Sequence, residues 1–256
     1  MFKDYYLKLE GKRALVTGAS SGIGFKTACF LAEQDCHVIA AARRLEKLNE
    51  LKSLYPERIT PVSKDLNLSS SLEEMGDRGF FDVDILVNNA GLALGKDLFE
   101  ASSDSDIETM VQTNLLTALK IAKKCLHHMK KNKIGDIVNI ASIASHEAYK
   151  GGVVYAATKH ALLASSKALR EETYGENIRI MTVSPGMVET EFSNVRFKGD
   201  LKKAKATYEG FNPLTSKDVA VQILNALRCP RHVNIDEILI LSSDQAGATK
   251  VKRTFK

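Results

Sequence analysis

Several features that would assign the chain to a special class are missing from its 256 residues. The four cysteines form no CxxC pair and are too few and too scattered for the disulfide framework of a small secreted domain. None is paired with a histidine at metal-ligand spacing, so we expect no metal. The first residues lack the apolar stretch of a signal peptide, and no run of about 18 apolar residues could span a membrane. We therefore expect a soluble, cytoplasmic protein with no membrane partner.

The positive charge is not concentrated anywhere along the chain. The formal net charge is +5 and 26% of the residues are charged, but the lysines are spread out. No basic stripe with interleaved aromatic residues is present, so we expect a solvated basic face and no nucleic-acid partner. The chain also has no internal repeat and no linker. Its length suits one large α/β domain, which we expect to cover residues 1–256.

The chain starts with a strand, a glycine-rich turn and a helix. An apolar run at residues 13–17 leads into Gly18, Gly22 and Gly24, and an amphipathic stretch follows over residues 25–34. Glycines also serve plain turns, but this position is the context of a turn that binds a pyrophosphate at a helix N-terminus. Gly18 permits the tight turn, Gly22 lets the backbone approach the phosphates, and Gly24 lets the helix pack closely on its strand.

The second predicted strand, residues 37–42, ends in Arg43 and Arg44 without a carboxylate. In dinucleotide-binding folds an acidic residue about 20 positions after the glycines binds the ribose 2′-hydroxyl, whereas arginine there suits a 2′-phosphate. A guanidinium can bind that phosphate through two hydrogen bonds. We therefore predict NADP rather than NAD. The alternative is that these arginines, or one of them, merely begin the next helix (residues 45–54) as solvated charges.

The remaining strands and helices predict a doubly wound α/β fold, with a parallel sheet of about seven strands and helices on both faces. Further strands are expected at residues 59–63, 84–88, 136–140, 178–183 and 237–241, and helices at about 106–131, from Tyr155 through Glu172, and at 218–229. Ligands bind at the carboxyl ends of such strands. Asn88 to Gly91, Ser142 and the Pro185-Gly186 pair stand there.

Two polar residues and one long segment need a reason. Asp65 follows the third strand and either caps the next helix or accepts a hydrogen bond from adenine. Asn114 lies in the apolar middle of a predicted helix, where a bare buried amide costs a few kcal/mol, so it either kinks the helix around a water or faces solvent. Residues 187–212 have weak periodicity and mixed charge and follow the sixth strand, which predicts a lid over a substrate.

Tyr155 and Lys159 are four residues apart on a predicted helix, and Ser142 precedes the tyrosine. At this spacing the two side chains share one helix face. One positive charge about 4 Å away, at an effective dielectric of about 20, would lower the phenol pKa by about three units from its usual value near 10. Such a tyrosine could exchange a proton near pH 7, as alcohol–carbonyl interconversion requires. The alternative is a half-buried ring beside a snorkelling amine.

Taken in order, these motifs resemble those of the short-chain dehydrogenase/reductase family over essentially the whole chain. The matching pieces are Thr17-Gly-Ala-Ser-Ser-Gly-Ile-Gly24, Asp65, Asn88-Asn-Ala-Gly91, Asn114, Ser142, Tyr155, Lys159 and Pro185-Gly186. Residues 89–95, 190–200 and 232–235 are also similar to the NADP-dependent 3-hydroxy acid dehydrogenases. That group oxidises serine and related 3-hydroxy acids such as 3-hydroxyisobutyrate, and reduces malonic semialdehyde.

The resemblance implies a role for each matching residue. Tyr155 would donate and accept the proton, Lys159 would lower its pKa and bind the nicotinamide ribose, Ser142 would hold the substrate oxygen, and Asn114 would place a water. The cofactor would lie along Gly18, Ser20, Ser21, Gly22, Ile23, Gly24, Arg43, Arg44, Asp65, Leu66, Asn89, Ala90, Gly91, Pro185, Gly186 and Val188. Ser21 stands where some NADP-using relatives carry a basic residue, so recognition of the 2′-phosphate would depend on the two arginines. A homotetramer is also implied.

Arg196, within the predicted lid, is the candidate partner of a substrate carboxylate because a guanidinium binds carboxylates bidentately. Lys198 is its nearest competitor. Alternatively, Arg196 anchors the lid to an acidic residue such as Glu191 or contacts a neighbouring subunit. A rival substrate is a bulkier carbonyl compound such as a 3-oxoacyl thioester or a steroid, and a rival function is that of a non-catalytic nucleotide-binding regulator.

Overall fold

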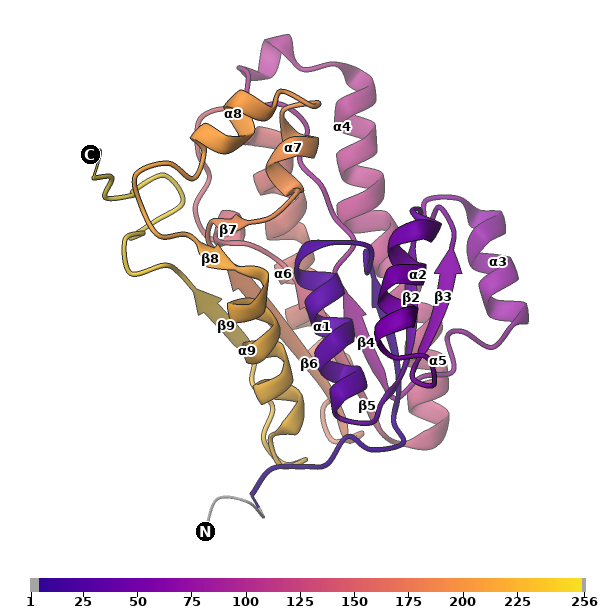
Figure 1. The fold of residues 1–256 in the computed structure, drawn as a ribbon. Coiled ribbons are helices and arrows are strands. Elements are labelled where there is room, and N and C mark those ends of the chain that lie inside the picture. The colour runs from indigo at the N-terminus through magenta and orange to yellow at the C-terminus, as the bar shows by residue number, and fades with distance from the viewer. Residues whose placement is uncertain (1–4, 255–256) are drawn as a thin grey trace.

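A parallel sheet of seven strands runs through the centre of the molecule (Figure 1). The computed structural model describes residues 5–254, so the start of the chain, on which the expectation of no signal peptide rests, lies outside the described residues. The strands follow the spatial order β3-β2-β1-β4-β5-β6-β9. Their bounds are β1 (Arg13–Thr17), β2 (His37–Ala42), β3 (Ile59–Ser63), β4 (Ile85–Asn88), β5 (Gly135–Ile140), β6 (Ile178–Pro185) and β9 (Glu237–Ile240). The predicted doubly wound parallel sheet is confirmed.

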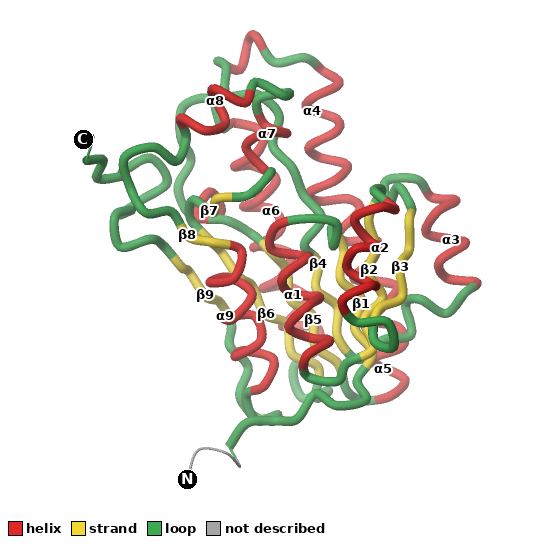
Figure 2. The backbone as a smooth tube through the Cα atoms, viewed as in Figure 1, coloured by secondary structure: helices red, strands yellow, loops and turns green. Residues whose placement is uncertain are grey.

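Helices cover both faces of the sheet (Figures 1 and 2). One face packs against α1 (Gly22–Glu33), α2 (Leu45–Leu54) and α9 (Ser216–Arg228), and the other against α3 (Ser69–Asp77), α5 (Ala118–Asn132) and α6 (Val153–Thr173). No described helix combines the length and the apolar character that a membrane span requires.

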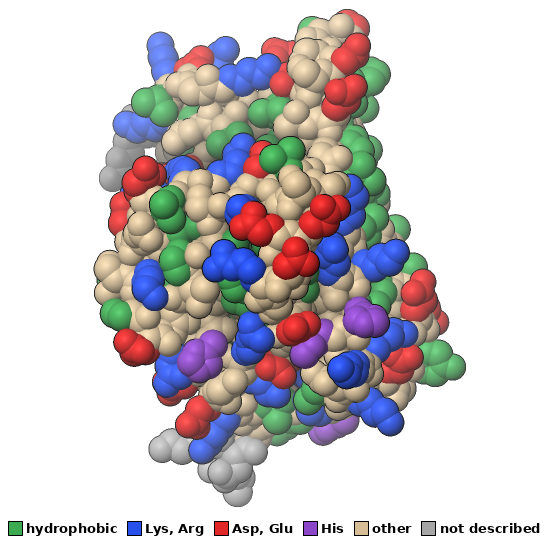
Figure 3. Space-filling model, turned by 90° about the vertical axis from the view of Figure 1, so that its right-hand side faces the viewer, with side chains coloured by type: hydrophobic (Ala, Val, Ile, Leu, Met, Phe, Trp, Pro, Cys, Tyr) green, Lys and Arg blue, Asp and Glu red, His purple; other side chains and the backbone are tan. Residues whose placement is uncertain are grey.

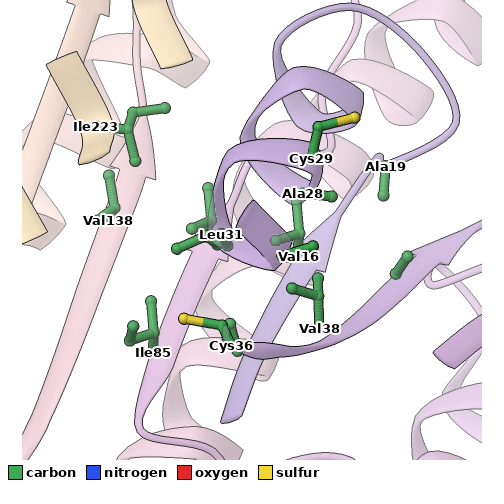
Figure 4. Packing of buried hydrophobic residues seen from close by; sticks show 14 of the residues in the cluster. Val16, Ala19, Ala28, Cys29, Leu31, Cys36, Val38, Ile85, Val138 and Ile223 are labelled. Carbon is green, nitrogen blue, oxygen red and sulfur yellow. The ribbon is translucent and has the colours of Figure 1, made fainter. Parts of the chain in front are cut away.

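The two layers have separate apolar cores because side chains alternate between the faces of a strand. On β1, Val16 points into the core under α1 and α9, whereas Leu15 points into the core on the opposite side. Figure 4 shows Val16 of β1 gathered with Leu31 of α1 in the first core, in which Ile85 and Ile223 also lie. This packing holds the carboxyl ends of the strands in a fixed arrangement.

The helix predicted over residues 106–131 is interrupted. It consists of α4 (Asp104–Val111), a π-helical turn (Gln112–Thr117) and α5. Asn114 lies in the π turn with 1% of its surface exposed, so it does not face solvent. Its side-chain oxygen accepts from the Leu92 N–H at 2.8 Å, and its Nδ2 donates to the Leu92 carbonyl at 2.8 Å and to Thr158 Oγ1 at 3.1 Å. The Leu92 backbone therefore provides hydrogen-bond partners for the buried amide. The extra residue of the π-helical turn orients the Asn114 side chain toward Leu92.

The segment at residues 187–212 lies above the carboxyl end of the sheet (Figure 1). It contains β7 (Val188–Glu189), α7 (Phe192–Arg196) and α8 (Leu201–Ala206), and β7 pairs in parallel with β8 (Leu214–Thr215). The C-terminal residues that the structure describes contact this segment. The Thr254 N–H donates to the Gly210 carbonyl, and the Arg253 guanidinium donates to backbone carbonyls of this segment and lies over the Phe211 ring.

Charged side chains of both signs are mixed on the surface beside α2 and α3. On the face shown in Figure 3, lysines and arginines alternate with aspartates and glutamates. Lys47 pairs with Glu50 on α2, and Lys64, which follows β3, pairs with Glu74 on α3. This face does not carry the continuous basic stripe that a nucleic-acid backbone would require.

Candidate active site

A cleft of about 500 Å³ opens at the carboxyl ends of the strands. It is lined by most of the residues predicted from the sequence to bind cofactor or substrate, namely Gly18, Ser20, Ser21, Gly22, Ile23, Arg43, Arg44, Asp65, Leu66, Asn89, Ala90, Gly91, Ser142, Tyr155, Lys159, Pro185, Gly186 and Val188. Three predicted residues lie outside this lining. Gly24 is buried beneath the glycine turn, Asn114 lies behind Gly91, and Arg196 lines a smaller cavity of about 110 Å³ that shares Tyr155 with the cleft.

The glycine turn and the N-terminus of α1 fit a pyrophosphate. Gly18 and Gly22 have φ angles of +65° and +55°, which side chains disfavour. A Cβ at Gly24 would lie 2.4 Å from the Asn89 side chain and 2.6 Å from the Gly18 carbonyl. The N-cap residue of α1, Ser21, makes no side-chain cap hydrogen bond, and the first turn contains no acidic residue. Unsatisfied N–H groups and the positive end of the helix dipole therefore remain at the cleft.

Thr17 was not predicted as a site residue. It joins the glycine turn after β1 to the Asn89–Gly91 segment after β4 through hydrogen bonds. Its hydroxyl accepts hydrogen bonds from the N–H groups of Asn89 and Ala90, both at 2.9 Å. The Asn89 side chain donates to the Thr17 carbonyl at 2.9 Å. The threonine before the glycine turn was the available signal, but its role depends on a strand that is distant in sequence.

The two arginines after β2 both line the cleft, but their surroundings differ. Arg44 donates to Ser20 Oγ from Nε at 3.3 Å and from Nη2 at 3.2 Å, and its Nη1 lies 2.7 Å from Glu191 Oε2. The side chain of Arg43 makes no ion pair within residues 5–254. Arg44 is therefore not a plain solvated start of α2, whereas the exposed side chain of Arg43 still fits that alternative. Glu191 and its neighbour Phe192 also line the cleft and were not predicted, although both lie in the segment expected to cover the substrate.

Lys159 lies deep in the cleft with 4% of its surface exposed. Its Nζ donates to the Ile140 carbonyl at 2.7 Å, and burial lowers its pKa from 10.5 to about 8. A Cβ at Gly91 would lie 3.5 Å from this Nζ and 3.2 Å from the Asn114 side-chain oxygen. Gly91 therefore leaves space beside both the ammonium and the amide.

The pKa of Tyr155 is raised in this structure, contrary to the expectation from the sequence. Burial is the main cause, and the Arg196 charge and a hydrogen bond with Ser142 act in the opposite direction. Lys159 Nζ is 5.9 Å from the centroid of the phenol ring, and its charge is not among the causes of the shift. Desolvation therefore outweighs the nearby charge, and the cation that opposes it is Arg196 rather than Lys159.

Arg196 lies against Tyr155 from the side of α7. Its guanidinium carbon is 5.1 Å from the centroid of the Tyr155 ring and 5.2 Å from that of Phe192. Its Nη2 donates to the Tyr149 hydroxyl at 3.0 Å, whereas its Nε is buried and makes no hydrogen bond within the described residues. The predicted alternative, an anchor to Glu191, is not observed because Glu191 pairs with Arg44.

Lys198, the competing cation, is already paired. Its Nζ lies 2.7 Å from Asp106 Oδ2, and 59% of its side chain is exposed. Tyr149 is the remaining residue that the sequence analysis missed here. The available signal was an aromatic residue in the loop between Ser142 and Tyr155, but its bond to Arg196 joins two distant segments.

Comparisons with known proteins agree with this arrangement. The model of the short chain dehydrogenase family matches residues 12–200. An NADP-dependent 3-hydroxy acid dehydrogenase of Schizosaccharomyces pombe is 43% identical over 96% of this chain and 98% of its own length, and a serine 3-dehydrogenase of Agrobacterium fabrum is 37% identical over 91% and 95%. The solved closed form of a serine dehydrogenase complexed with NADP+ superposes with a TM-score of 0.90 at 38% identity, covering 94% of this chain and all of the other. Serine dehydrogenase from Escherichia coli gives 0.79 at 32%, covering 91% of this chain and 99% of the other.

Proposed function

Because the chain belongs to the short-chain dehydrogenase family and is an NADP-dependent oxidoreductase acting on CH–OH groups, we propose that it interconverts short 3-hydroxy acids and 3-oxo acids. Serine, 3-hydroxyisobutyrate and malonic semialdehyde belong to this substrate class. The observation that carries the proposal is the position of Arg196, a guanidinium that lies against the Tyr155 ring and can bind a carboxylate. The names of the relatives described above support the same class.

The residues of the cleft suit each part of the cofactor. NADP, when bound, supplies the hydride chemistry of the reaction. The turn from Gly18 to Gly24 would hold the pyrophosphate, and Arg43 and Arg44 would hold the 2′-phosphate. The base and ribose would lie along Asp65, Leu66, Asn89, Ala90 and Gly91, and the nicotinamide along Pro185, Gly186 and Val188.

Tyr155 is the proposed proton donor and acceptor. Tyr155 and Ser142 both line the cleft, where a substrate oxygen could accept a hydrogen bond from either hydroxyl. The cationic Lys159 and Arg196 would stabilise the phenolate that remains after the proton has left. Asn114 is proposed to hold a water that links Lys159 to solvent, and it holds the Leu92 backbone in place.

The carboxylate of the acid is proposed to bind at Arg196. The buried Nε–H of this guanidinium has no acceptor among the described residues, whereas Lys198 is already paired with Asp106. Because Arg196 lies in α7, the segment at residues 187–212 would act as a lid that excludes water when the acid is bound.

The test is a comparison of Arg196→Met with Lys198→Met in steady-state oxidation of serine and 3-hydroxyisobutyrate with NADP. A charge-assisted hydrogen bond contributes about 1.5–3 kcal/mol, so Arg196→Met should lower kcat/KM for the acids about 10- to 150-fold. The methyl esters, which lack the negative charge, should lose much less, and Lys198→Met should retain most of the activity toward the acids. Equal losses for acids and esters, or parental kinetics in Arg196→Met, would reject the carboxylate site.

A second assay addresses the chemistry and the rival substrate. Tyr155→Phe should lose turnover while still binding NADPH, because only the proton-carrying oxygen is removed. A parent enzyme that turns over 3-oxoacyl thioesters or steroids but not the short acids would instead identify a reductase of bulkier carbonyls.

We also propose a cytoplasmic homotetramer in which the helices that bear Asn114 and Tyr155 pack against their copies. Leu116, Leu119 and Val153 on these helices are 41%, 40% and 53% exposed, which leaves apolar surface available for such packing. Light scattering of the purified protein would give the oligomeric mass, and fractionation of the source cells would give the location.

A further inference from the structure

An ion pair between Arg44 and Glu191 joins the end of β2 to the segment at residues 187–212. Arg44 donates through Nε and Nη2 to Ser20 of the glycine turn, and its Nη1 pairs with Glu191 at 2.7 Å. The preceding residue, Thr190, lies against the turn as well, since its methyl group would be 3.2 Å from a Cβ at Gly22. The start of the proposed lid is therefore in direct contact with the phosphate-binding turn.

The carboxylate of Glu191 pairs with Arg44 Nη1, an N–H donor that a bound phosphate would otherwise use. A guanidinium has five N–H donors in one plane. In Arg44, Nε and Nη2 already donate to Ser20, and Nη1 pairs with Glu191. Glu191 also lines the cleft, so its negative charge faces any anion bound beside Arg44. Arg43 has no ion-pair partner in the described part of the chain and remains available. The two arginines are thus unequal: one is open to an anion and the other is partly neutralised.

We propose that Glu191 limits the preference of the enzyme for NADP over NAD, because its carboxylate competes with the 2′-phosphate for Arg44. The 2′-phosphate must displace the carboxylate or share the guanidinium with it, and in both cases the two negative charges repel each other. NAD has a hydroxyl at this position and meets no such opposition. The proposal depends on the nucleotide cleft alone and holds for any substrate of the enzyme.

Glutamine at position 191 keeps the shape of the side chain and removes its charge. Both partners of the pair are partly exposed, at 44% and 48% of their side chains, and such pairs are weak in water. Removal of the carboxylate should therefore tighten NADPH binding by about three- to ten-fold, while the dissociation constant of NADH should change by less than about two-fold. Glu189→Gln is the matched control because Glu189 is exposed, lies two residues earlier on β7 and makes no ion pair within residues 5–254.

The experiment measures the dissociation constants of NADPH and NADH by titration calorimetry, without an acid substrate, for the parent, Glu191→Gln and Glu189→Gln. The same pair of constants is then measured for Arg44→Met and for the double variant Arg44→Met/Glu191→Gln. If Glu191 acts through Arg44, its effect on NADPH binding should largely vanish when Arg44 is absent. Arg43 should keep NADPH binding measurable in these variants.

Three results would overturn the proposal. NADPH affinity could be unchanged or weaker in Glu191→Gln, or its gain could persist in the Arg44→Met background. Both cofactors could instead weaken together, which would identify the ion pair as a tie that holds the lid over any dinucleotide. A failure of the enzyme to turn over 3-hydroxy acids would leave all these binding constants as they are, so the two proposals can fail separately.

Discussion

Lys159→Met is expected to make the protein more stable at neutral pH while removing its activity. Lys159 has 4% of its surface exposed, and burial lowers the pKa of its ammonium from 10.5 to about 8. A base with a lower pKa in the folded state binds fewer protons there than in the unfolded chain. The buried charge therefore costs stability below about pH 8, and this cost disappears as the pH rises toward 10.5. A site residue that reduces stability is typical of function gained at the expense of stability.

The size of the effect follows from the two pKa values. The fall from 10.5 to about 8 corresponds to about 3 kcal/mol of lost stability at pH 7, about 2 kcal/mol at pH 9 and less than about 1 kcal/mol at pH 10. The variant also loses the hydrogen bond from Nζ to the Ile140 carbonyl, which contributes about 1 kcal/mol. We therefore expect a net gain of about 2 kcal/mol at pH 7 that vanishes or changes sign by pH 10.

Urea denaturation of the cofactor-free protein at pH 7, 9 and 10, at one protein concentration, would measure this difference. The thiol of Cys36, whose pKa burial raises to about 12, titrates equally in parent and variant and cancels. Lys12→Met is the matched control, because the Lys12 side chain is 36% exposed and its ammonium pairs with Asp84 at 3.2 Å. This substitution should change stability by less than about 1 kcal/mol at each pH. The reasoning fails if Lys159→Met is no more stable than the parent at pH 7, or if its advantage is the same at pH 7 and pH 10.

Three further predictions concern the scaffold. Arg179 is 3% exposed and donates to both carboxylate oxygens of Asp136, at 2.7 and 3.0 Å. Arg179→Met should therefore lower the free energy of unfolding, measured by urea denaturation, by about 3–5 kcal/mol, and a decrease of less than about 1 kcal/mol would contradict this. Gly24→Ala should weaken NADPH binding at least about ten-fold by displacing Asn89, whereas Gly76→Ala, whose nearest neighbour would be 3.9 Å away, should bind NADPH as the parent does in calorimetry. Of the four cysteines, only Cys229 is not buried, so a thiol reagent should label one cysteine in the native protein and four in urea; rapid labelling of a second would show that the core opens.

The sheet was predictable because its signal is local. The bounds of β1, β2, α2 and β3 agree with those expected, since each is a short apolar or amphipathic run that ends in a turn signal. The π turn around Asn114 was not predictable from its own segment. The apolar pattern continues across residues 112–117, and the reason for the extra residue is Leu92, which lies on another part of the chain.

The site shows the same division between local and distant causes. The glycine turn, the two arginines and Ser142 stand at strand ends and were placed in the cleft from their position alone. The pKa of Tyr155 was predicted in the wrong direction because helical spacing gives the nearest charge but not the degree of burial. The bond between Arg196 and Tyr149 could not be predicted at all, since it requires knowledge of how α7 lies over the start of α6.

The distribution of paired and unpaired cations links the two ends of the cleft. At each end the protein neutralises one cation with its own carboxylate, Arg44 with Glu191 and Lys198 with Asp106. At each end another guanidinium is left without an acidic partner among residues 5–254, Arg43 beside the glycine turn and Arg196 beside Tyr155. Positive charge left unpaired at two places in one binding region raises the local concentration of anions there. A phosphorylated dinucleotide and a carboxylic acid are the pair of ligands that would supply one anion to each end.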